Sequence, residues 1–174
     1  MKSVRPLGLY VHIPFCKAKC VYCDFYSLPH SEARMDAYTD ALCAHLTEAA
    51  PLAASHTVDT VYFGGGTPSY LGEKRLSRIL KVIVKRYHVA KDAEITFEAN
   101  PDSAGDWKAL RTLRRAGFNR ISLGMQSACD AELKAIGRVH TAEQVGQAVE
   151  AARKAKIKNL SLDLIYGLPG QTQE

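Results

Sequence analysis

The chain has 174 residues, enough for one domain with a hydrophobic core. It is 47% hydrophobic and 24% charged, which is typical of a globular protein. No apolar run approaches the roughly 18–20 residues of a membrane-spanning helix, so we expect no integral membrane segment. The net charge of +5 is small and the Lys and Arg residues are scattered, which argues against a nucleic-acid partner.

The cysteine count bears on the cellular compartment. Five cysteines cannot all pair in internal disulfides, because the number is odd. No secretory signal is visible, since the apolar stretch 7–15 is short, contains His12 and Pro14, and lacks a small-residue cleavage site. We therefore expect a cytoplasmic protein, in which clustered cysteines serve metal or redox chemistry.

Predicted strands and helices alternate along the chain. The elements are, in chain order, a strand at 7–13, a helix at 32–49, a strand at 60–63, a helix at 73–87, a strand at 94–99, a helix that Asp102 or Ser103 caps and that ends at Gly117, a strand at 120–125, a helical turn near 129–136, a helix at 141–156 and a strand at 159–166. Five strands that alternate with helices predict a parallel α/β sheet with helices on its outer face.

Three of these strands alternate polar and apolar residues, whereas a parallel sheet covered on both faces should be apolar nearly throughout. The polar sets are Glu94, Thr96 and Glu98; Arg120, Ser122, Gly124 and Gln126; and Asn159, Ser161 and Asp163. This face is either simply exposed or is the lumen of a curved, open barrel that holds a polar ligand. Its members Glu98, Gln126 and Asp163 lie toward the carboxyl ends of their strands, where α/β folds build their sites.

The sequence after the last predicted strand lacks an expected element. Gly167-Leu168-Pro169-Gly170 and four more residues follow, and no helix begins there. We therefore expect residues 1–174 to form a partial (β/α) barrel that is incomplete at its C-terminus.

Three cysteines, Cys16, Cys20 and Cys23, lie within eight residues. Three buried structural thiols so close together would be unusual. A structural zinc needs four ligands, and His12 is the available fourth. Thiolates at such spacings otherwise hold an iron–sulfur cluster, and a [4Fe–4S] cluster on three thiolates leaves one iron open for a substrate or cofactor. The residues alone leave both metals possible.

Two further features have a functional and an ordinary interpretation. The three glycines at 64–66 follow a predicted strand and would let the backbone approach a ligand closely, or they form a tight turn. Arg138 follows Gly137 and would pair with a carboxylate, or it is a solvated surface residue.

The motif Tyr10-Val-His-Ile-Pro-Phe-Cys16-x3-Cys20-x-Tyr22-Cys23 resembles the radical S-adenosylmethionine (SAM) superfamily. Within it, the chain is similar to the branch of oxygen-independent coproporphyrinogen III oxidase and the haem chaperone HemW. Five more motifs fit that branch in order, namely Tyr62-Phe-Gly-Gly-Gly-Thr-Pro68, Glu98-Ala-Asn-Pro101, Asn119-Arg-Ile-Ser-Leu-Gly-Met-Gln126, Gly137-Arg-Val-His140 and Asp163-Leu-Ile-Tyr-Gly-Leu-Pro-Gly170. The resemblance covers nearly the whole chain.

The resemblance implies that Cys16, Cys20 and Cys23 ligate a [4Fe–4S] cluster whose fourth iron is chelated by the amino and carboxylate groups of SAM. Reduction of the cluster would cleave SAM to methionine and a 5′-deoxyadenosyl radical. The implied SAM contacts are Tyr10, Tyr22, Gly65, Gly66, Thr67 and Glu98, with Gln126, Arg138 and Asp163 near a second SAM or other cofactor atoms. Cys43 and Cys129 are expected to bind no metal.

Two departures from the oxidase pattern favour the HemW-like side of the branch. The oxidase carries a further cysteine where this chain has Phe25, and it has a longer segment before its first strand, whereas nine residues precede Tyr10 here. The implied function is haem binding and delivery to an acceptor protein, with a flavodoxin-like or ferredoxin-like reductant and a haem site downstream of these residues. The alternatives are oxidative decarboxylation of coproporphyrinogen III and a non-catalytic zinc or electron-transfer module.

Overall fold

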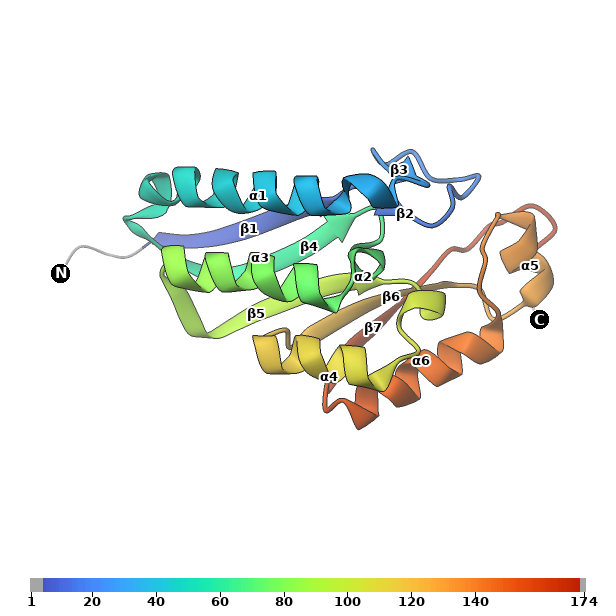
Figure 1. Ribbon diagram of the computed structural model, residues 1–174. Helices are drawn as coiled ribbons and strands as arrows, with labels where there is room; N and C mark the ends of the chain where they lie inside the picture. The colour runs from blue at the N-terminus through green and yellow to red at the C-terminus, as the bar shows by residue number, and fades with distance from the viewer. Residues whose placement is uncertain (1–4, 173–174) are drawn as a thin grey trace.

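A five-stranded parallel sheet forms the centre of the molecule, which is a computed structural model describing residues 5–172 (Figure 1). The strand order is β1-β4-β5-β6-β7, and each neighbouring pair is parallel. The strands are β1 (Arg5–Ile13), β4 (His56–Gly65), β5 (Val89–Ala99), β6 (Arg120–Gln126) and β7 (Asn159–Leu164). The predicted parallel α/β architecture is confirmed, and β4 and β5 begin earlier than the sequence pattern predicts.

Four longer helices cover one face of this sheet (Figure 1). They are α1 (Met35–Ala49), α3 (Glu73–Arg86), α4 (Trp107–Ala116) and α6 (Ala142–Lys154). The short elements are β2 (Phe15–Cys16), β3 (Leu28–Pro29), α2 (Pro68–Leu71), α5 (Asp130–Ala135) and the 3-10 turns Glu32–Arg34, Ala50–Ala53 and Pro101–Ser103. Among the described residues, no helix is long and apolar enough to span a membrane.

The hydrophobic core lies between the helices and the sheet. Phe63 of β4, Phe97 of β5 and Phe118 are each fully buried. The Phe118 ring packs edge-on against both others, with centroid distances of 5.0 and 5.2 Å. The apolar positions of β5 and β6 are therefore buried under the helices, as predicted, whereas Leu162 and Leu164 of β7 are 41% and 65% exposed.

The opposite face of the sheet is polar and internally bonded. Arg120 of β6 forms an ion pair with Glu94 at 3.7 Å and donates to Ser161 Oγ at 3.2 Å. Ser122, which is 5% exposed, donates to the Asp163 carboxylate at 3.0 Å. These side chains hydrogen-bond to side chains of neighbouring strands and not only to solvent. The face therefore resembles the lumen of a barrel.

The start of α4 differs from the prediction. Neither Asp102 nor Ser103 caps the helix, because Pro101–Ser103 forms a separate 3-10 turn. Asp106 is the N-cap instead, and its carboxylate accepts from the Lys108 backbone N–H at 2.8 Å. The Asp102 carboxylate pairs with Lys17 at 3.4 Å. The predicted end at Gly117 is confirmed, since Gly117 has φ of +125° just after Ala116.

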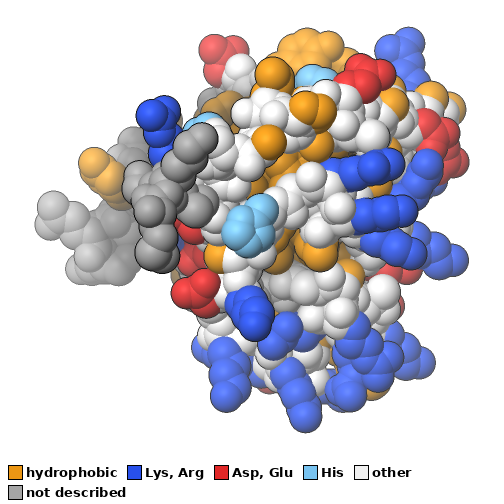
Figure 2. Space-filling view, turned by 90° about the vertical axis from the view of Figure 1, so that its left-hand side faces the viewer, with side chains coloured by type: hydrophobic (Ala, Val, Ile, Leu, Met, Phe, Trp, Pro, Cys, Tyr) orange, Lys and Arg blue, Asp and Glu red, His pale blue; other side chains and the backbone are white. Residues whose placement is uncertain are grey.

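Basic side chains gather at the end of the molecule away from the cysteines (Figure 2). Each helix runs back from the carboxyl end of one strand to the start of the next, so the last helical turns all lie at this end. Their basic residues are Lys85 and Arg86 of α3, Arg114 and Arg115 of α4, and Arg153 and Lys154 of α6. These positive charges lie at the negative ends of the helix dipoles and stabilise the helices. This gives much of the net positive charge of the chain a structural role.

Candidate cofactor site

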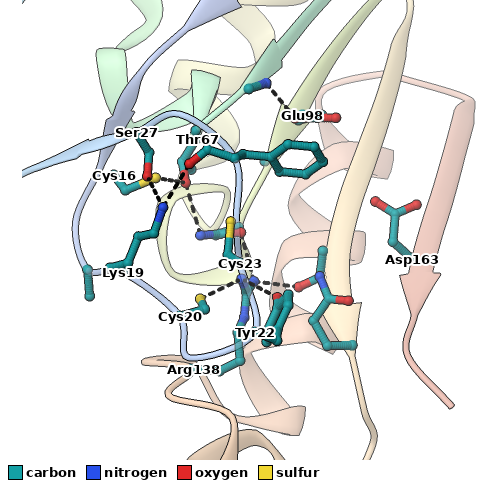
Figure 3. A pocket seen from close by; sticks show the side chains of 18 of the residues that line it. Cys16, Lys19, Cys20, Tyr22, Cys23, Ser27, Thr67, Glu98, Arg138 and Asp163 are labelled. Carbon is teal, nitrogen blue, oxygen red and sulfur yellow. Dashed lines mark hydrogen bonds between the residues drawn. The ribbon is translucent and has the colours of Figure 1, made fainter. Parts of the chain in front are cut away.

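A cavity of about 310 Å³ lies between the carboxyl ends of the strands and the segment Cys16–Ser27, called here the cysteine loop. Eleven of the twelve residues predicted for the site line it, namely Cys16, Cys20, Tyr22, Cys23, Gly65, Gly66, Thr67, Glu98, Gln126, Arg138 and Asp163. They come from the cysteine loop, four strands or strand ends, and the segment after α5 (Figure 3). Predicted site residues that are up to 147 positions apart in the sequence therefore line the same cavity.

Tyr10 is the predicted site residue that does not line the cavity. Its ring is 61% exposed and stacks on Tyr62 at a centroid distance of 6.3 Å. Its hydroxyl hydrogen-bonds with His12 Nδ1 at 3.1 Å, and His12 Nε2 bonds the Tyr26 carbonyl at 3.0 Å. Tyr10 therefore contacts the cysteine loop indirectly, through His12.

Hydrogen bonds within the protein shape the cysteine loop. The Cys23 N–H donates to the Cys20 carbonyl at 3.2 Å, and the Val21 N–H donates to the Ile136 carbonyl at 3.2 Å. Lys19 Nζ donates to the Phe25 carbonyl at 2.7 Å and to Ser27 Oγ at 3.2 Å. Lys19 was not predicted as a site residue, because its partner is a backbone carbonyl that no sequence pattern marks.

The three cysteine thiols line one cavity, and three thiolates are a donor set that fits a [4Fe–4S] cluster with one open iron. Among residues 5–172, no three Cys, His, Asp or Glu side chains gather closely enough to hold one metal ion. In a [4Fe–4S] cluster each thiolate binds a different iron, so the sulfurs surround a space instead of meeting at a point. Both ring nitrogens of His12 already have partners, which argues against His12 as a fourth zinc ligand.

Two of the cysteines face hydrogen-bond donors inside the protein. Thr67 Oγ1 donates to Cys16 Sγ at 3.6 Å, and Arg138 Nη1 donates to Cys20 Sγ at 3.6 Å. Burial raises the pKa of the Cys16 thiol above its ordinary value, and the hydrogen bond from Thr67 opposes that rise. Donors of this kind stabilise negative charge on sulfur, which a cluster ligand must carry.

The glycines at the end of β4 and directly after it allow close backbone packing. The Gly66 N–H donates to the Ile13 carbonyl at 2.8 Å, and the next N–H, of Thr67, donates to the Phe15 carbonyl at 2.8 Å. A β-carbon at Gly66 would lie 2.8 Å from the Phe15 oxygen. Gly65 has φ of +112° and donates its N–H to Glu98. A glycine at position 66 is therefore required for the backbone just before the cysteine loop to pack closely against the end of β4.

Glu98 is held on the lumen face by two donors. Tyr62 OH donates to one carboxylate oxygen at 2.7 Å, and the Gly65 N–H donates to the other at 3.2 Å. Burial raises the pKa of Glu98 above its usual value, against the opposing effect of these two hydrogen bonds. A partly buried carboxylate with an open side toward the cavity is suited to a cationic group.

The raised pKa of Glu98 predicts a dependence of stability on pH. An acid with a raised folded-state pKa contributes most below its unfolded pKa, which is about 4.3, and this contribution is lost as pH rises through the folded value. We expect the free energy of unfolding to fall with rising pH relative to the Glu98→Gln variant, starting at about pH 4. Urea denaturation of both proteins across this range measures it. Parallel curves would contradict the assignment.

Tyr22, Gln126 and Asp163 complete the wall of the cavity. Burial raises the pKa of Tyr22 to about 12, so its phenol remains protonated at neutral pH. Gln126 has φ of +67°, a left-handed conformation that is uncommon outside glycine. Asp163 accepts from Ser122 and faces the cavity (Figure 3). The cavity thus offers amide, phenol and carboxylate groups in addition to the thiols.

Comparisons with known proteins agree with this geometry. The family description "Radical SAM superfamily" matches residues 10–174. HemW haem chaperones are 40% identical to this chain in Mycobacterium tuberculosis, over 98% of this chain and 44% of the relative, and in Escherichia coli, over 100% and 46%. Oxygen-independent coproporphyrinogen III oxidase of Escherichia coli is 37% identical over 98% of this chain and 37% of its own length.

The solved structure of the coproporphyrinogen III oxidase HemN from Escherichia coli, described as a radical SAM enzyme, superposes with a TM-score of 0.89 at 36% identity. The superposition covers 97% of this chain and 39% of HemN. This chain thus spans less than half the length of these relatives. The three thiols on one cavity, the polar lumen and the match over residues 10–174 have one explanation: the chain belongs to the radical SAM superfamily, which implies a [4Fe–4S] cluster and SAM.

Proposed function

We propose that this chain is the cluster- and SAM-binding part of a cytoplasmic, HemW-like haem chaperone that delivers haem to an acceptor protein. The observation that carries the proposal is the cavity, in which three thiols face a polar lumen. The identity of 40% with HemW proteins supports the haem chaperone over other members of the superfamily. We propose residues 1–174 as an incomplete radical SAM core, with the haem site in the remainder of the full-length protein.

The cysteine loop would hold the cluster through Cys16, Cys20 and Cys23. When bound there and reduced, the cluster would supply the electron for cleavage of SAM. Glu98 would accept hydrogen bonds from the ammonium group or the ribose hydroxyls of SAM, since its carboxylate is buried and fixed by Tyr62.

The remaining predicted residues would surround the cofactor on its other sides. Gly65 and Gly66 would bring backbone close to the methionine end of SAM, and Thr67 would add a hydroxyl. Tyr22 would lie near the adenine through its neighbouring backbone. Gln126, Arg138 and Asp163 would bind a second SAM or nearby cofactor atoms. Tyr10 would act near SAM only indirectly, because His12 stands between its hydroxyl and the cysteine loop.

The second candidate function is oxidative decarboxylation of coproporphyrinogen III. The TM-score of 0.89 with HemN favours it. Phe25 disfavours it, because the oxidase pattern has a further cysteine at that place. Phe25 lines the cavity and is 69% exposed, so a thiol there would have reached the same space. Either function needs a reductant, which we propose is a flavodoxin-like or ferredoxin-like protein.

Haem binding by the full-length protein distinguishes the two functions. We expect the reconstituted protein to retain haem on gel filtration, to transfer it to an apo-haemoprotein, and to leave coproporphyrinogen III unchanged in the presence of SAM and dithionite. Absorbance spectra and chromatography of porphyrins measure these results. Decarboxylation of the porphyrinogen without retention of haem would support the oxidase instead.

A further inference from the structure

A chain of hydrogen bonds connects two of the cavity's cysteines through residues far apart in sequence (Figure 3). Arg138 Nη1 donates to Cys20 Sγ at 3.6 Å, and Arg138 Nη2 donates to Asn100 Oδ1 at 2.7 Å. Asn100 Nδ2 donates to Thr67 Oγ1 at 3.2 Å, and the Thr67 hydroxyl donates to Cys16 Sγ at 3.6 Å. We call these three residues, Arg138, Asn100 and Thr67, the relay.

The chemistry of the three side chains fixes the direction of every bond in the relay. A guanidinium only donates, so the Asn100 amide must present its oxygen to Arg138 and its NH₂ to Thr67. The Thr67 oxygen then accepts from Asn100, which leaves its own hydrogen free for Cys16. Both ends of the relay therefore donate to sulfur, and the orientation of the central amide determines this.

The protein holds Asn100 in place from several sides. Its carbonyl accepts from the Ser103 N–H and hydroxyl, both at 3.0 Å, and its N–H donates to Ser69 Oγ at 3.4 Å. Arg138 Nη2 also donates a hydrogen bond to the Gly124 carbonyl at 2.7 Å. A β-carbon at Gly124 would lie 3.2 Å from Arg138 Nη2 and 3.3 Å from Asn100 Oδ1. The absence of a side chain at Gly124 thus leaves room for this pair.

We propose that Asn100 is a positioning residue of the cluster site, which aims the donors of Thr67 and Arg138 at the sulfurs of Cys16 and Cys20 and so raises the reduction potential of the cluster. Hydrogen bonds to ligand sulfurs stabilise the more negative, reduced cluster, and they are one of the factors that set its potential. The inference rests on the cluster of the proposed function and not on haem.

The Asn100→Asp variant tests the relay with little change in shape. A carboxylate still accepts from Arg138 but donates nothing to Thr67, whose hydroxyl then turns to the carboxylate and leaves Cys16 without its donor. The matched control is Gln126→Glu, which adds the same charge to the same cavity at a side chain outside the relay. Asn100→Ala removes the relay without adding charge.

The measurement is the midpoint potential of the full-length, reconstituted protein without SAM, by EPR-monitored redox titration. We expect a more negative potential in Asn100→Ala, and in Asn100→Asp a larger negative shift than in Gln126→Glu. The shift caused by Asn100→Ala should become smaller in a Thr67→Val background, because the Cys16 donor is then already lost. Thermal melting of each variant checks that it is folded.

Equal shifts in Asn100→Asp and Gln126→Glu, together with an unchanged potential in Asn100→Ala, would overturn the inference. So would an unchanged SAM-free potential with weaker SAM binding, since Asn100 would then serve SAM and not the sulfurs. Failure of the proposed haem function is a separate result, because absence of haem binding leaves the comparison of SAM-free potentials intact.

Discussion

Replacing Cys16, Cys20 or Cys23 with serine is expected to abolish assembly of the cluster. Each thiol lines the cavity that the cysteine loop forms with the sheet. A serine hydroxyl is a poor ligand for iron, and the loss should exceed the roughly 10–100-fold effect of removing a residue that only orients a ligand. Iron and sulfide analysis after anaerobic reconstitution measures the loss, and EPR of the reduced protein with and without SAM shows whether an open iron remains.

The other two cysteines provide matched controls for this prediction. Cys129 is exposed and precedes α5, and Cys43 is buried in α1. Neither lines the cavity. We expect Cys129→Ser and Cys43→Ser to bind as much iron as the unmodified protein and to keep the response of the EPR signal to SAM. A SAM-responsive cluster in Cys23→Ser, or its loss in Cys129→Ser, would contradict the assignment of ligands.

Three polar residues of the cavity were predictable from strand geometry, which determines the side chains that share a face, whereas the other site residues were predicted from the family resemblance. Successive residues in a strand point to opposite faces, so the polar positions Glu98, Gln126 and Asp163 could be assigned to one side before their contacts were known. Their place near the carboxyl ends of parallel strands then put them at one edge of the sheet. The structure shows all three around one cavity.

The relay was not predictable in the same way. Asn100 follows β5 in a non-repeating segment, and only its place in a motif distinguishes it in the sequence. Its partners Thr67 and Arg138 belong to other loops, and no periodic pattern connects loops. Lys19 was missed for the same reason, since it binds the Phe25 carbonyl. Such residues become identifiable only when the loops have been placed relative to one another.

The error in the predicted start of α4 has a related cause. Asp102 and Ser103 are both good N-cap residues by type, and local preference alone cannot choose between them and Asp106. Tertiary contacts decide, because Asp102 pairs with Lys17 of the cysteine loop and Ser103 bonds the Asn100 carbonyl. The segment between β5 and α4 is therefore used to support the cavity instead of extending the helix.

Gly66 is where the fold and the cavity depend most directly on one residue. We expect Gly66→Ala to destabilise the protein by about 1–3 kcal/mol, the usual cost of forcing an extra carbon into a packed interior. The new β-carbon would lie 2.8 Å from the Phe15 oxygen, 2.9 Å from the Ile13 oxygen and 2.9 Å from the Pro14 carbonyl carbon. These are backbone atoms, so no side chain can move aside to relieve the contact.

The control for this change is Gly146→Ala, in the middle of α6. A β-carbon there has no neighbour within 4 Å, and the position is exposed. Replacing a helical glycine with alanine should stabilise the protein by about 0.5–1 kcal/mol. Urea denaturation of both variants, compared with the unmodified protein, should therefore give shifts of opposite sign. Equal shifts, or an unaffected Gly66→Ala protein, would contradict this account.

The Gly66→Ala substitution should also affect the cofactor site. Ile13 and Phe15, just before the cysteine loop, accept hydrogen bonds from the backbone N–H groups of Gly66 and Thr67. If alanine at position 66 pushes this backbone away, Cys16 moves with it, because it directly follows Phe15. We therefore expect Gly66→Ala to bind less iron than Gly146→Ala under conditions in which both remain folded. Equal iron content would mean that the loop adjusts independently of the sheet.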